Sequence, residues 1–316
     1  MSSAKKRVAV IGECLIELNG TPFGVLQQAF GGDTLNTALY LARIAGQAIE
    51  VKYVSVLGMD SLSDGMLQRW RAEEIGTDLV LRDASRLPGL YLIQVDEHGE
   101  RTFLYWRSES AARYLLRHPG FARVAAELHK VDLVFLSGIS LAILPAEDRL
   151  LLLELLKKLV ANGVTLAFDC NYRAALWPSP EPARAIKSAL MPLAKLVFAT
   201  FDDEQRLWSD DMPQTTLARL HGARAQQVIL KMGAQGCLHS DGSRVTEVPA
   251  LAVPVVDTTA AGDAFNAGFL SRWLMGRSAG ECCRAGNVLA GTVIQHRGAI
   301  IPAAAMPAES VLVSLS

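Results

Sequence analysis

The sequence predicts an α/β fold in which a mostly parallel central sheet lies between helices, with a small β appendage. Three observations lead to this prediction. Short apolar runs alternate with helix-like stretches, one stretch has the pattern of a β-hairpin, and the 316 residues, of which 50% are hydrophobic, are enough for a large buried core. Strands that alternate with helices form right-handed crossovers and pair in parallel, so ligands are expected at the carboxyl ends of the strands.

The strands of the central sheet are predicted from five short apolar runs, which are typical of strands buried on both faces. These runs are residues 7–13, 131–138, 164–169, 195–200 and 227–233. The clearest helix between them is 147–160, with the sequence EDRLLLLELLKKLV, and Asn162 and Gly163 follow it as a stop signal. This alternation accounts for most of the chain.

The appendage is predicted from residues 89–107, where two apolar runs surround the polar residues 97–100. This pattern indicates a hairpin and not a crossover. Side chains alternate along a strand, so Tyr91 and Tyr105 are expected on one face, together with Arg107. The other face is expected to carry Leu92, Leu104 and Trp106. A lone hairpin is marginally stable, so both faces need a covering partner.

Composition argues against several classes of function. The 31 basic and 32 acidic side chains give no excess of positive charge for binding nucleic acid. The five cysteines are scattered without a C-x-x-C spacing, which argues against a zinc site and disulfides and favours a reducing compartment. No apolar run approaches the roughly 20 residues of a membrane span. We therefore expect a cytoplasmic protein without membrane or nucleic-acid partners.

The stretch VVDTTAAGDAFNAG places small residues before a helix-like sequence. Ala260, Ala261 and Gly262 allow backbone N–H groups to converge at the start of that helix, which predicts an anion hole. Asp263 would repel a phosphate, so beside such a hole we expect it to accept a proton from an attacking hydroxyl. The alternative is an acidic helix cap. Asp257 is either a turn residue or a support for the loop, through a hydrogen bond or a cation.

A second small-residue stretch, GGDTLNTALYLARIAG, lies near the N-terminus. Gly31 and Gly32 suit a backbone that passes close to a sugar. Asp33 and Asn36 offer groups that accept from sugar hydroxyls or donate to them. The alternative is a plain strand-to-helix turn capped by Thr34. Sugar contact by this turn is the prediction.

Both stretches resemble the two signatures of the ribokinase-like, PfkB-type sugar kinases, which carry them in the same order. The resemblance covers essentially the whole chain, including GECLIEL from Gly12, FDCNYR from Phe168, LKMGAQG from Leu230 and QHRGAIIP from Gln295. One departure is Ala260, where many members of the family have glycine. The resemblance implies a ribokinase-like three-layer sandwich, a single domain over residues 1–316, with a β lid formed by segments near 12–20 and 89–107.

Within the family, the sequence is most similar to members that phosphorylate 2-dehydro-3-deoxy-D-gluconate. This similarity rests on LPGLYLIQVDEHGERTFLYWR, LSGISLAIL and DTTAAGD. It implies transfer of the γ-phosphoryl group of ATP to the 6-hydroxyl of that sugar acid, with Asp263 as the base and Ala260, Ala261 and Gly262 as the anion hole. It also implies Mg²⁺ on the phosphates, for which we predict no protein ligand, and leaves a monovalent cation open.

The resemblance further assigns the ligand contacts. For the nucleotide they are Asn171, Lys231, Gly233, Gly236, Gly262 and Asn287. For the sugar acid they are Gly31, Gly32, Asp33, Asn36, Tyr91, Tyr105, Arg107, Arg173 and Asp263. A carboxylate is best paired by arginine, whose planar fork matches two oxygens, so Arg107 and Arg173 are its expected partners. The alternatives are a plain β-turn at the later glycines, a surface position for Asn287 and solvated arginines.

Other functions are also compatible with parts of the sequence. Within the family, the alternatives are a fructokinase-like enzyme and a 2-ketogluconate kinase. A catalytically inactive sugar-sensing protein is disfavoured because Asp263 is present. A dinucleotide oxidoreductase would need G-x-G-x-x-G after the first strand, where the chain has Gly12, Glu13 and Cys14. We also expect a homo-oligomer through the lid, because the apolar face of the hairpin needs a cover.

Overall fold

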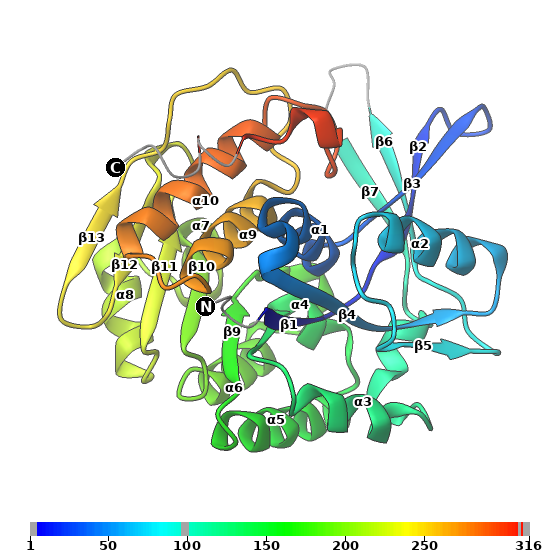
Figure 1. Ribbon diagram of the computed structural model, residues 1–316, viewed down its shortest axis with the longest axis horizontal. Coiled ribbons are helices and arrows are strands. Elements are labelled where there is room, and N and C mark those ends of the chain that lie inside the picture. The colour runs from blue at the N-terminus through cyan, green and yellow to red at the C-terminus, as the bar shows by residue number, and fades with distance from the viewer. Residues whose placement is uncertain (1–4, 96–100, 309–310, 312–316) are drawn as a thin grey trace.

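The computed structural model describes residues 5–95, 101–308 and 311. Within these residues the chain forms a nine-stranded sheet and a separate four-stranded sheet (Figure 1). The strands of the large sheet, in spatial order, are β13 (Val245–Val248), β12 (Cys237–Ser240), β11 (Gln227–Lys231), β10 (Leu196–Thr200), β9 (Thr165–Asp169), β8 (Leu133–Ser137), β1 (Lys6–Ile11), β4 (Ile49–Gly58) and β5 (Val80–Asp83).

The large sheet is mostly parallel, which confirms the predicted fold class. All neighbours from β11 across to β5 pair in parallel, whereas β12 and β13 are antiparallel additions at one edge. Each of the five predicted strands is present, and the predicted helix is α5 (Ala146–Ala161). The chain order reverses at β1, whose neighbours are β8 and β4. Such a switch point opens a crevice at the carboxyl ends of the strands.

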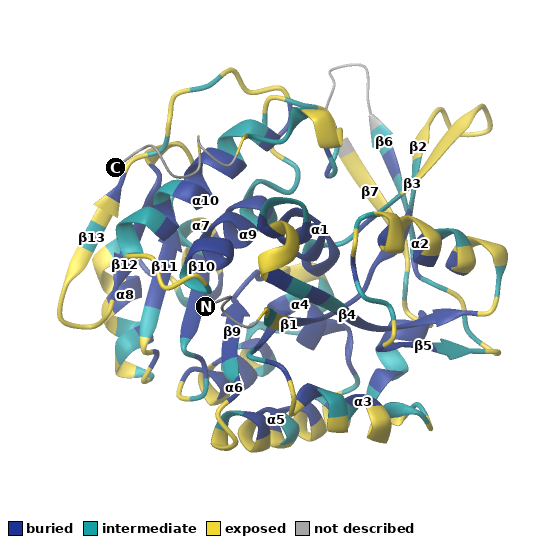
Figure 2. Cartoon of the chain, viewed as in Figure 1, coloured by how far each residue is buried: buried dark blue, intermediate teal, exposed yellow. Residues whose placement is uncertain are grey.

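Helices cover both faces of the large sheet (Figure 1). Alternate residues of β1 point to opposite faces: Val8 and Val10 enter one core cluster, and Ala9 and Ile11 enter the other. The first cluster includes α1 (Asp33–Ala45), α2 (Ser61–Ala72), α9 (Ala261–Trp273) and α10 (Ala279–Val293). The second includes α5 together with α3 (Phe121–Leu128), α4 (Gly138–Ile143), α6 (Pro180–Leu190), α7 (Phe201–Trp208) and α8 (Pro213–Gly222). Figure 2 shows the sheet as the buried centre of these layers.

The position of α9 is fixed by close packing against α10. A Cβ at Gly268 would lie 2.5 Å from the carbonyl oxygen of Ala285, so only glycine lets the two backbones approach this closely. The start of α10 is set by a capping box in which Ser278 and Glu281 satisfy each other's backbone N–H groups. The first turn of α9, where the predicted anion hole lies, is therefore carried on a rigid helix.

The small sheet has the order β3 (Leu26–Gly31), β2 (Leu15–Gly20), β6 (Leu90–Val95) and β7 (Arg101–Trp106), and it lies beside the large sheet in Figure 1. The hairpin of β6 and β7 pairs Tyr91 with Tyr105 and Leu92 with Leu104, so the predicted faces are confirmed. The predicted turn at 97–100 lies outside the described residues. The strand β3 was not predicted, because its run LQQAFG has a polar centre.

Two findings concern the whole chain. All five cysteines are buried free thiols, as their scattered spacing predicts. Among the helices of the described ranges, none combines the length and the apolar composition needed to cross a bilayer. A cytoplasmic location stays a prediction.

Replacing Gly268 with Ala should destabilise the protein, although alanine is the better helix former. The added Cβ would push α9 away from the Ala285 carbonyl, and overpacking of this kind costs about 1 to 3 kcal/mol. Gly280→Ala in α10 is the matched control, because a Cβ there would meet only the guanidinium end of Arg284 at 3.4 Å. Thermal unfolding should show a lower Tm for the first variant and an equal or slightly higher Tm for the second. Equal Tm values for both variants would contradict this account of the helix contact.

Candidate active site

Side chains from four elements meet at the carboxyl edge of the large sheet. Asp169 and Lys231 are the last residues of β9 and β11. Asp33 is the first residue of α1, and Asp263 lies in the first turn of α9. The two signature stretches are brought together here, because the side-chain amide of Asn36 donates to Oδ2 of Asp263 at 2.8 Å. The site therefore lies where the fold predicts ligand binding.

The predicted anion hole lies at the N-terminus of α9. Ala260 is the N-cap and has a left-handed backbone conformation (φ 61°, ψ 11°), which explains why glycine is frequent at this position in the family. The N–H of Ala261 donates to the carbonyl of Thr258 at 3.2 Å, so this amide closes the turn. Gly262 follows, and a Cβ there would lie 3.4 Å from Nζ of Lys231. The positive end of a helix thus lies next to a buried ammonium, and phosphate binding at this point stays a prediction.

Asp257 fixes the loop that leads into α9. Its Oδ1 accepts from the N–H of Thr259 at 3.0 Å and from the hydroxyl of the same residue at 2.7 Å. Its Oδ2 accepts from the N–H of Gly298 at 2.7 Å. These bonds support the interpretation of Asp257 as a turn residue that holds the loop, and they join the QHRGAIIP stretch to the signature.

Asp263 is a partly buried carboxylate and not a helix cap. It is the third residue of α9, whose N-cap makes no side-chain capping bond, so the helix-cap alternative is wrong. The pKa of Asp263 is raised to about 7, mainly by burial and then by the carboxylates of Asp33 and Asp169, whereas the Asn36 hydrogen bond and the Lys231 ammonium oppose the rise. A carboxylate with this pKa is suited to accept a proton near neutral pH.

Asp33 is held by donors from three segments. Its Oδ2 accepts from the hydroxyl of Ser137 and, at 2.8 Å, from the side-chain amide of Asn171. Its Oδ1 accepts from the N–H of Thr34 at 2.8 Å. Burial still raises the pKa of Asp33, and Asp169 adds to the rise. Asn171, predicted to contact the nucleotide, therefore positions Asp33, and its contact with a nucleotide stays a prediction.

The glycines before α1 are explained by close approaches within the protein. A Cβ at Gly31 would lie 2.8 Å from the hydroxyl of Tyr91, and one at Gly32 would lie 2.4 Å from the carbonyl oxygen of Glu13. Gly32 is the N-cap of α1, and the hydroxyl of Thr34 bonds to a tyrosine instead, so capping by Thr34 is wrong. Contact of this turn with a sugar stays a prediction. Of the predicted polar contacts, Asn36 keeps a buried side-chain oxygen that has no hydrogen-bond partner among the described residues.

Both predicted arginines have acidic partners. Nε of Arg107 donates to the buried carboxylate of Glu13 at 2.9 Å, and Nη2 contacts the same oxygen. Nη1 of Arg173 lies 3.1 Å from Oδ2 of Asp203. Burial raises the pKa of Tyr105, and the charges of Arg107 and Arg173 oppose this rise. Arg107 is largely buried, so the solvated alternative is wrong for it, whereas the side chain of Arg173 is 51% exposed and that alternative stands.

The residues predicted to bind the nucleotide lie in different environments. Gly233 (φ 57°) and Gly236 (φ 93°) have conformations that favour glycine, and a Cβ at Gly236 would lie 2.2 Å from the carbonyl oxygen of Val248. Asn287 is buried, and its side-chain amide donates to the carbonyls of Val248 at 3.1 Å and Pro249 at 3.0 Å. The surface alternative for Asn287 is therefore wrong. Contact of these residues with a nucleotide stays a prediction.

Three buried side chains of the site were not predicted: Glu13, Asp169 and Asn266. Nζ of Lys231 lies 3.2 Å from Oδ2 of Asp169 and 3.1 Å from Oδ1 of Asn266, and the Asn266 amide donates to Asp169 at 2.6 Å. Sequence signals for them existed. Glu13 and Asp169 are acids at the carboxyl ends of apolar strands, and Asn266 lies one helical turn after Asp263.

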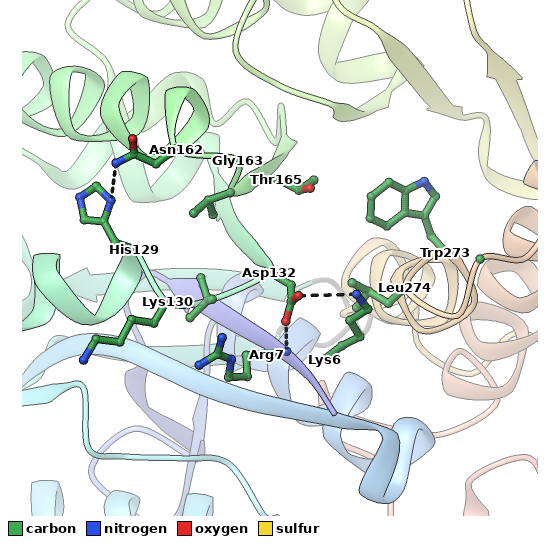
Figure 3. A pocket seen from close by; sticks show the side chains of 13 residues that line it. Lys6, Arg7, His129, Lys130, Asp132, Asn162, Gly163, Thr165, Trp273 and Leu274 are labelled. Atoms are coloured by element: carbon green, nitrogen blue, oxygen red, sulfur yellow. Dashed lines mark hydrogen bonds and ion pairs between the residues drawn. The ribbon is translucent and has the colours of Figure 1, made fainter. Parts of the chain in front are cut away.

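A hollow of about 530 Å³ lies apart from this site (Figure 3). Its lining comes from the amino ends of β1, β8 and β9 and from the end of α9. Within it, Asp132 accepts from the N–H of Arg7 at 2.7 Å and pairs with Lys6 at 3.5 Å. Ligands of such sheets bind at the opposite, carboxyl ends of the strands, and no predicted site residue lines the hollow. The cluster around Asp263 is therefore the candidate active site.

The fold and the site together define a small-molecule phosphotransferase. A carboxylate with a pKa of about 7 lies in the first turn of a helix, at the carboxyl edge of a mostly parallel sheet. The chain belongs to the pfkB family of carbohydrate kinases, whose pattern matches residues 5–306. The predictions of the family and of a carbohydrate kinase are confirmed.

Individual relatives agree with this assignment. The chain is 53% identical to the 2-dehydro-3-deoxygluconokinase of Haemophilus influenzae over 300 residues, which cover 94% of this chain and 96% of the relative. It is 31% identical to fructokinase-1 of Oryza sativa subsp. japonica over 282 residues, 86% of this chain and 84% of the relative. A solved fructokinase with bound ATP from Xylella fastidiosa has a TM-score of 0.80 at 24% identity, over 98% of each chain, which shows the shared fold.

Replacing Asp263 with Asn should abolish activity but stabilise the fold. The variant keeps an acceptor for Asn36 and cannot take a proton, so kcat should fall by about 10² to 10⁴. The raised pKa of Asp263 means that the folded protein binds the proton more tightly than the unfolded chain, so stability falls as the pH rises from about 4 to about 7. Asp263→Asn has no ionisable group at this position, so it does not lose stability over this pH range.

Thermal unfolding and steady-state kinetics check both effects. The Tm of Asp263→Asn should exceed that of the wild type at about pH 8, and the difference should shrink at about pH 5. A near-normal kcat would show that Asp263 is not the base. A Tm difference independent of pH would show that its carboxylate is not under electrostatic strain.

Proposed function

We propose that the protein transfers the γ-phosphoryl group of ATP to the 6-hydroxyl of 2-dehydro-3-deoxy-D-gluconate, giving the 6-phosphate. The observation that carries this proposal is the placement of two arginines. Arg107 lies 5.8 Å from the centre of the Tyr105 ring and its charge acts on Asp33 of the site, and Arg173 follows the end of β9, which carries Asp169. A sugar acid has a carboxylate at one end and the reacting hydroxyl at the other. The arginines would hold the first, and Asp263 would act on the second.

The free edges of the two arginines suit a carboxylate. Arg173 donates to its protein partners through Nη1, so within the described residues Nε and Nη2 have no partner and present a two-pronged edge. Arg107 uses Nε and Nη2 for Glu13 and keeps Nη1. A carboxylate could therefore be bound by the Arg173 fork and contacted by Arg107 and the Tyr105 hydroxyl. Fructose and ribose offer no charge to these groups.

The chemistry of the transfer follows from the residues around Asp263. The carboxylate must be ionised to take the proton of the attacking hydroxyl, and Asn36 holds it in place by donating to Oδ2. The N-terminus of α9 faces the transferring group with its positive end and stabilises negative charge there. Positioning and charge neutralisation contribute most of the catalysis in phosphoryl transfer.

Mg²⁺ fits this site as a companion of the nucleotide. Within the described residues there is no group of three or more His, Cys, Asp or Glu side chains arranged to hold a metal ion, which suits a cation held by phosphates and water. Asp169 raises the pKa of both Asp33 and Asp263, and Asp33 raises that of Asp263, so a bound cation would relieve this repulsion. When bound, Mg²⁺ supplies charge neutralisation on the phosphates. A monovalent cation near the Asp257 loop is a further part of the proposal.

We also propose that the small sheet is a lid over the sugar and the contact surface of a homo-oligomer. Trp106 is 57% exposed and Leu104 is 39% exposed in the single chain, so neither folds back onto the α/β body. Figure 2 shows β7 as an exposed strand. A symmetric contact between two such sheets would bury the apolar face against its copy.

Substrate choice tests the proposed function. ADP release should be measured with 2-dehydro-3-deoxygluconate, 2-ketogluconate, fructose and ribose side by side, and the 3-deoxy keto acid should give the highest kcat/KM. Arg173→Met should weaken binding of the keto acid by about 1 kcal/mol, because its side chain is 51% exposed and solvent screens the pair, and should leave the KM for ATP unchanged. Arg107→Met should act in the same direction.

Two results would contradict the proposal. A higher kcat/KM for fructose or ribose would end the sugar-acid assignment. Normal keto-acid binding by both arginine variants would show that the carboxylate is held elsewhere. Arg224→Met is a control for the loss of a positive charge, because Arg224 lies in the turn before β11, away from the site.

Lid pairing makes a separate prediction. Trp106→Glu would place a charge in the proposed contact, so sedimentation should shift toward the monomer and the affinity for the sugar acid should fall. Val245→Glu is the matched control, because Val245 is similarly exposed, at 54%, but lies on β13 at the far edge of the large sheet. Wild-type protein that sediments as a monomer at micromolar concentration would refute lid pairing.

A further inference from the structure

The buried triangle of Lys231, Asp169 and Asn266 has no role in the mechanism proposed above. We infer that the Lys231 ammonium, held by Asp169 and Asn266 next to Gly262, is the fixed positive charge that tunes the base Asp263 and supports the anion hole. This inference rests on the proposed function for the identity of the base. It gives Lys231 a role distinct from that of a nucleotide-loop residue.

The triangle is buried, and its members bond to one another. Asp169 is 3% exposed, Lys231 is 8% exposed and Asn266 is fully buried. Each member bonds to the other two: the ammonium donates to both partners, and the Asn266 amide donates to Asp169. A buried charge is tolerated only with such pairing, because an unpaired one costs several kcal/mol. The ammonium is therefore held at a fixed point.

That fixed point lies at the first turn of α9. A Cβ on Gly262 would be 3.4 Å from Nζ of Lys231, which is van der Waals contact, so the ammonium lies directly beside this residue. Nζ contacts both carboxylate oxygens of Asp169, at 3.4 Å and 3.2 Å, and Oδ1 of Asn266 at 3.1 Å, so its position beside Gly262 is fixed. A positive charge placed there reinforces the positive end of the helix.

The charges that face Asp263 come from three elements. Asp33 and the hydroxyl of Tyr40 lie on α1, Asp169 lies on β9 and Lys231 lies on β11. Burial, Asp33 and Asp169 all raise the pKa of Asp263, and Lys231 lowers it. The two charged members of the triangle therefore act on the base with opposite signs, although they share one set of hydrogen bonds.

These opposite signs separate an electrostatic role from a structural one. Lys231→Met and Asp169→Asn break the same triangle, so loss of packing alone would affect both variants alike. The electrostatic role predicts that the pKa of Asp263 rises in Lys231→Met and falls in Asp169→Asn, each by about one unit. Asn266→Leu breaks the triangle without changing charge and should leave this pKa near its wild-type value.

The ionisation of Asp263 is measured both during turnover and in the absence of substrate. The acid limb of the pH profile of kcat/KM should move to higher pH in Lys231→Met and to lower pH in Asp169→Asn. In protein with ¹³C-labelled aspartate, NMR titration should show the same shifts for the Asp263 carboxyl, identified by its absence in Asp263→Asn. The titration uses no substrate, so it still tests the inference if the proposed substrate is wrong.

Kinetic constants give a second readout. Lys231→Met should lower kcat by about 10²-fold at a pH above the acid limbs of both the variant and the wild type, as loss of a transition-state donor does. The KM for the sugar acid should change little. Should that variant fail to fold, Lys231→Gln keeps a donor without the charge and gives the same test. Shifts of equal sign in the lysine and aspartate variants, or no shift in either, would overturn the inference.

Discussion

The repulsion among three carboxylates is the constraint on which the rest of this structure depends. Asp33, Asp169 and Asp263 come from α1, β9 and α9. Asp169 raises the pKa of both Asp33 and Asp263, and Asp33 raises that of Asp263. Left to themselves, such groups would separate or take up protons. Each is instead held by its own donors: Ser137 and Asn171 for the first, Lys231 and Asn266 for the second, and Asn36 for the third. The fold brings these donors to one edge.

The close packing of the surrounding helices works against this repulsion. Repulsion among the carboxylates lowers the stability of the folded state, and the loss is greatest at pH values at which the acids are ionised. The contact of Gly268 with Ala285 and the approach of Gly286 to the ring of Phe265 hold α9 against α10 without any gap for a side chain. Dispersion contacts of this kind offset part of the electrostatic loss, and they keep Asp263 from moving away from Asp33.

The sequence was sufficient to predict the fold class and the centre of the site. It was not sufficient to predict the hydrogen bonds and ion pairs that hold the site residues. Apolar runs predicted the parallel strands, and small residues around Asp263 predicted the helix start, because both signals are local. The strand β3 escaped because LQQAFG pairs through backbone bonds to β2 and lies largely exposed, so its side chains carry no alternation. The ion pairs of Glu13 and Asp169 could not be predicted for another reason. Their partners, Arg107 and Lys231, are 94 and 62 residues away in the sequence, and a local sequence pattern cannot reveal contacts over such separations.

The ion pair of Glu13 and Arg107 connects the two parts of the molecule. Glu13 follows β1 of the large sheet, and Arg107 follows β7 of the small sheet, so the pair joins both sheets at the crevice. The outer strand of the small sheet is exposed on both faces, as Tyr105 at 53% and Trp106 at 57% show, and such thinly packed strands move more easily than the core. A buried charge pair at the base of the sheet limits that motion to its outer edge. The arginine proposed to meet the substrate carboxylate is therefore tied to the large sheet, which also carries Asp169 and Lys231 of the site.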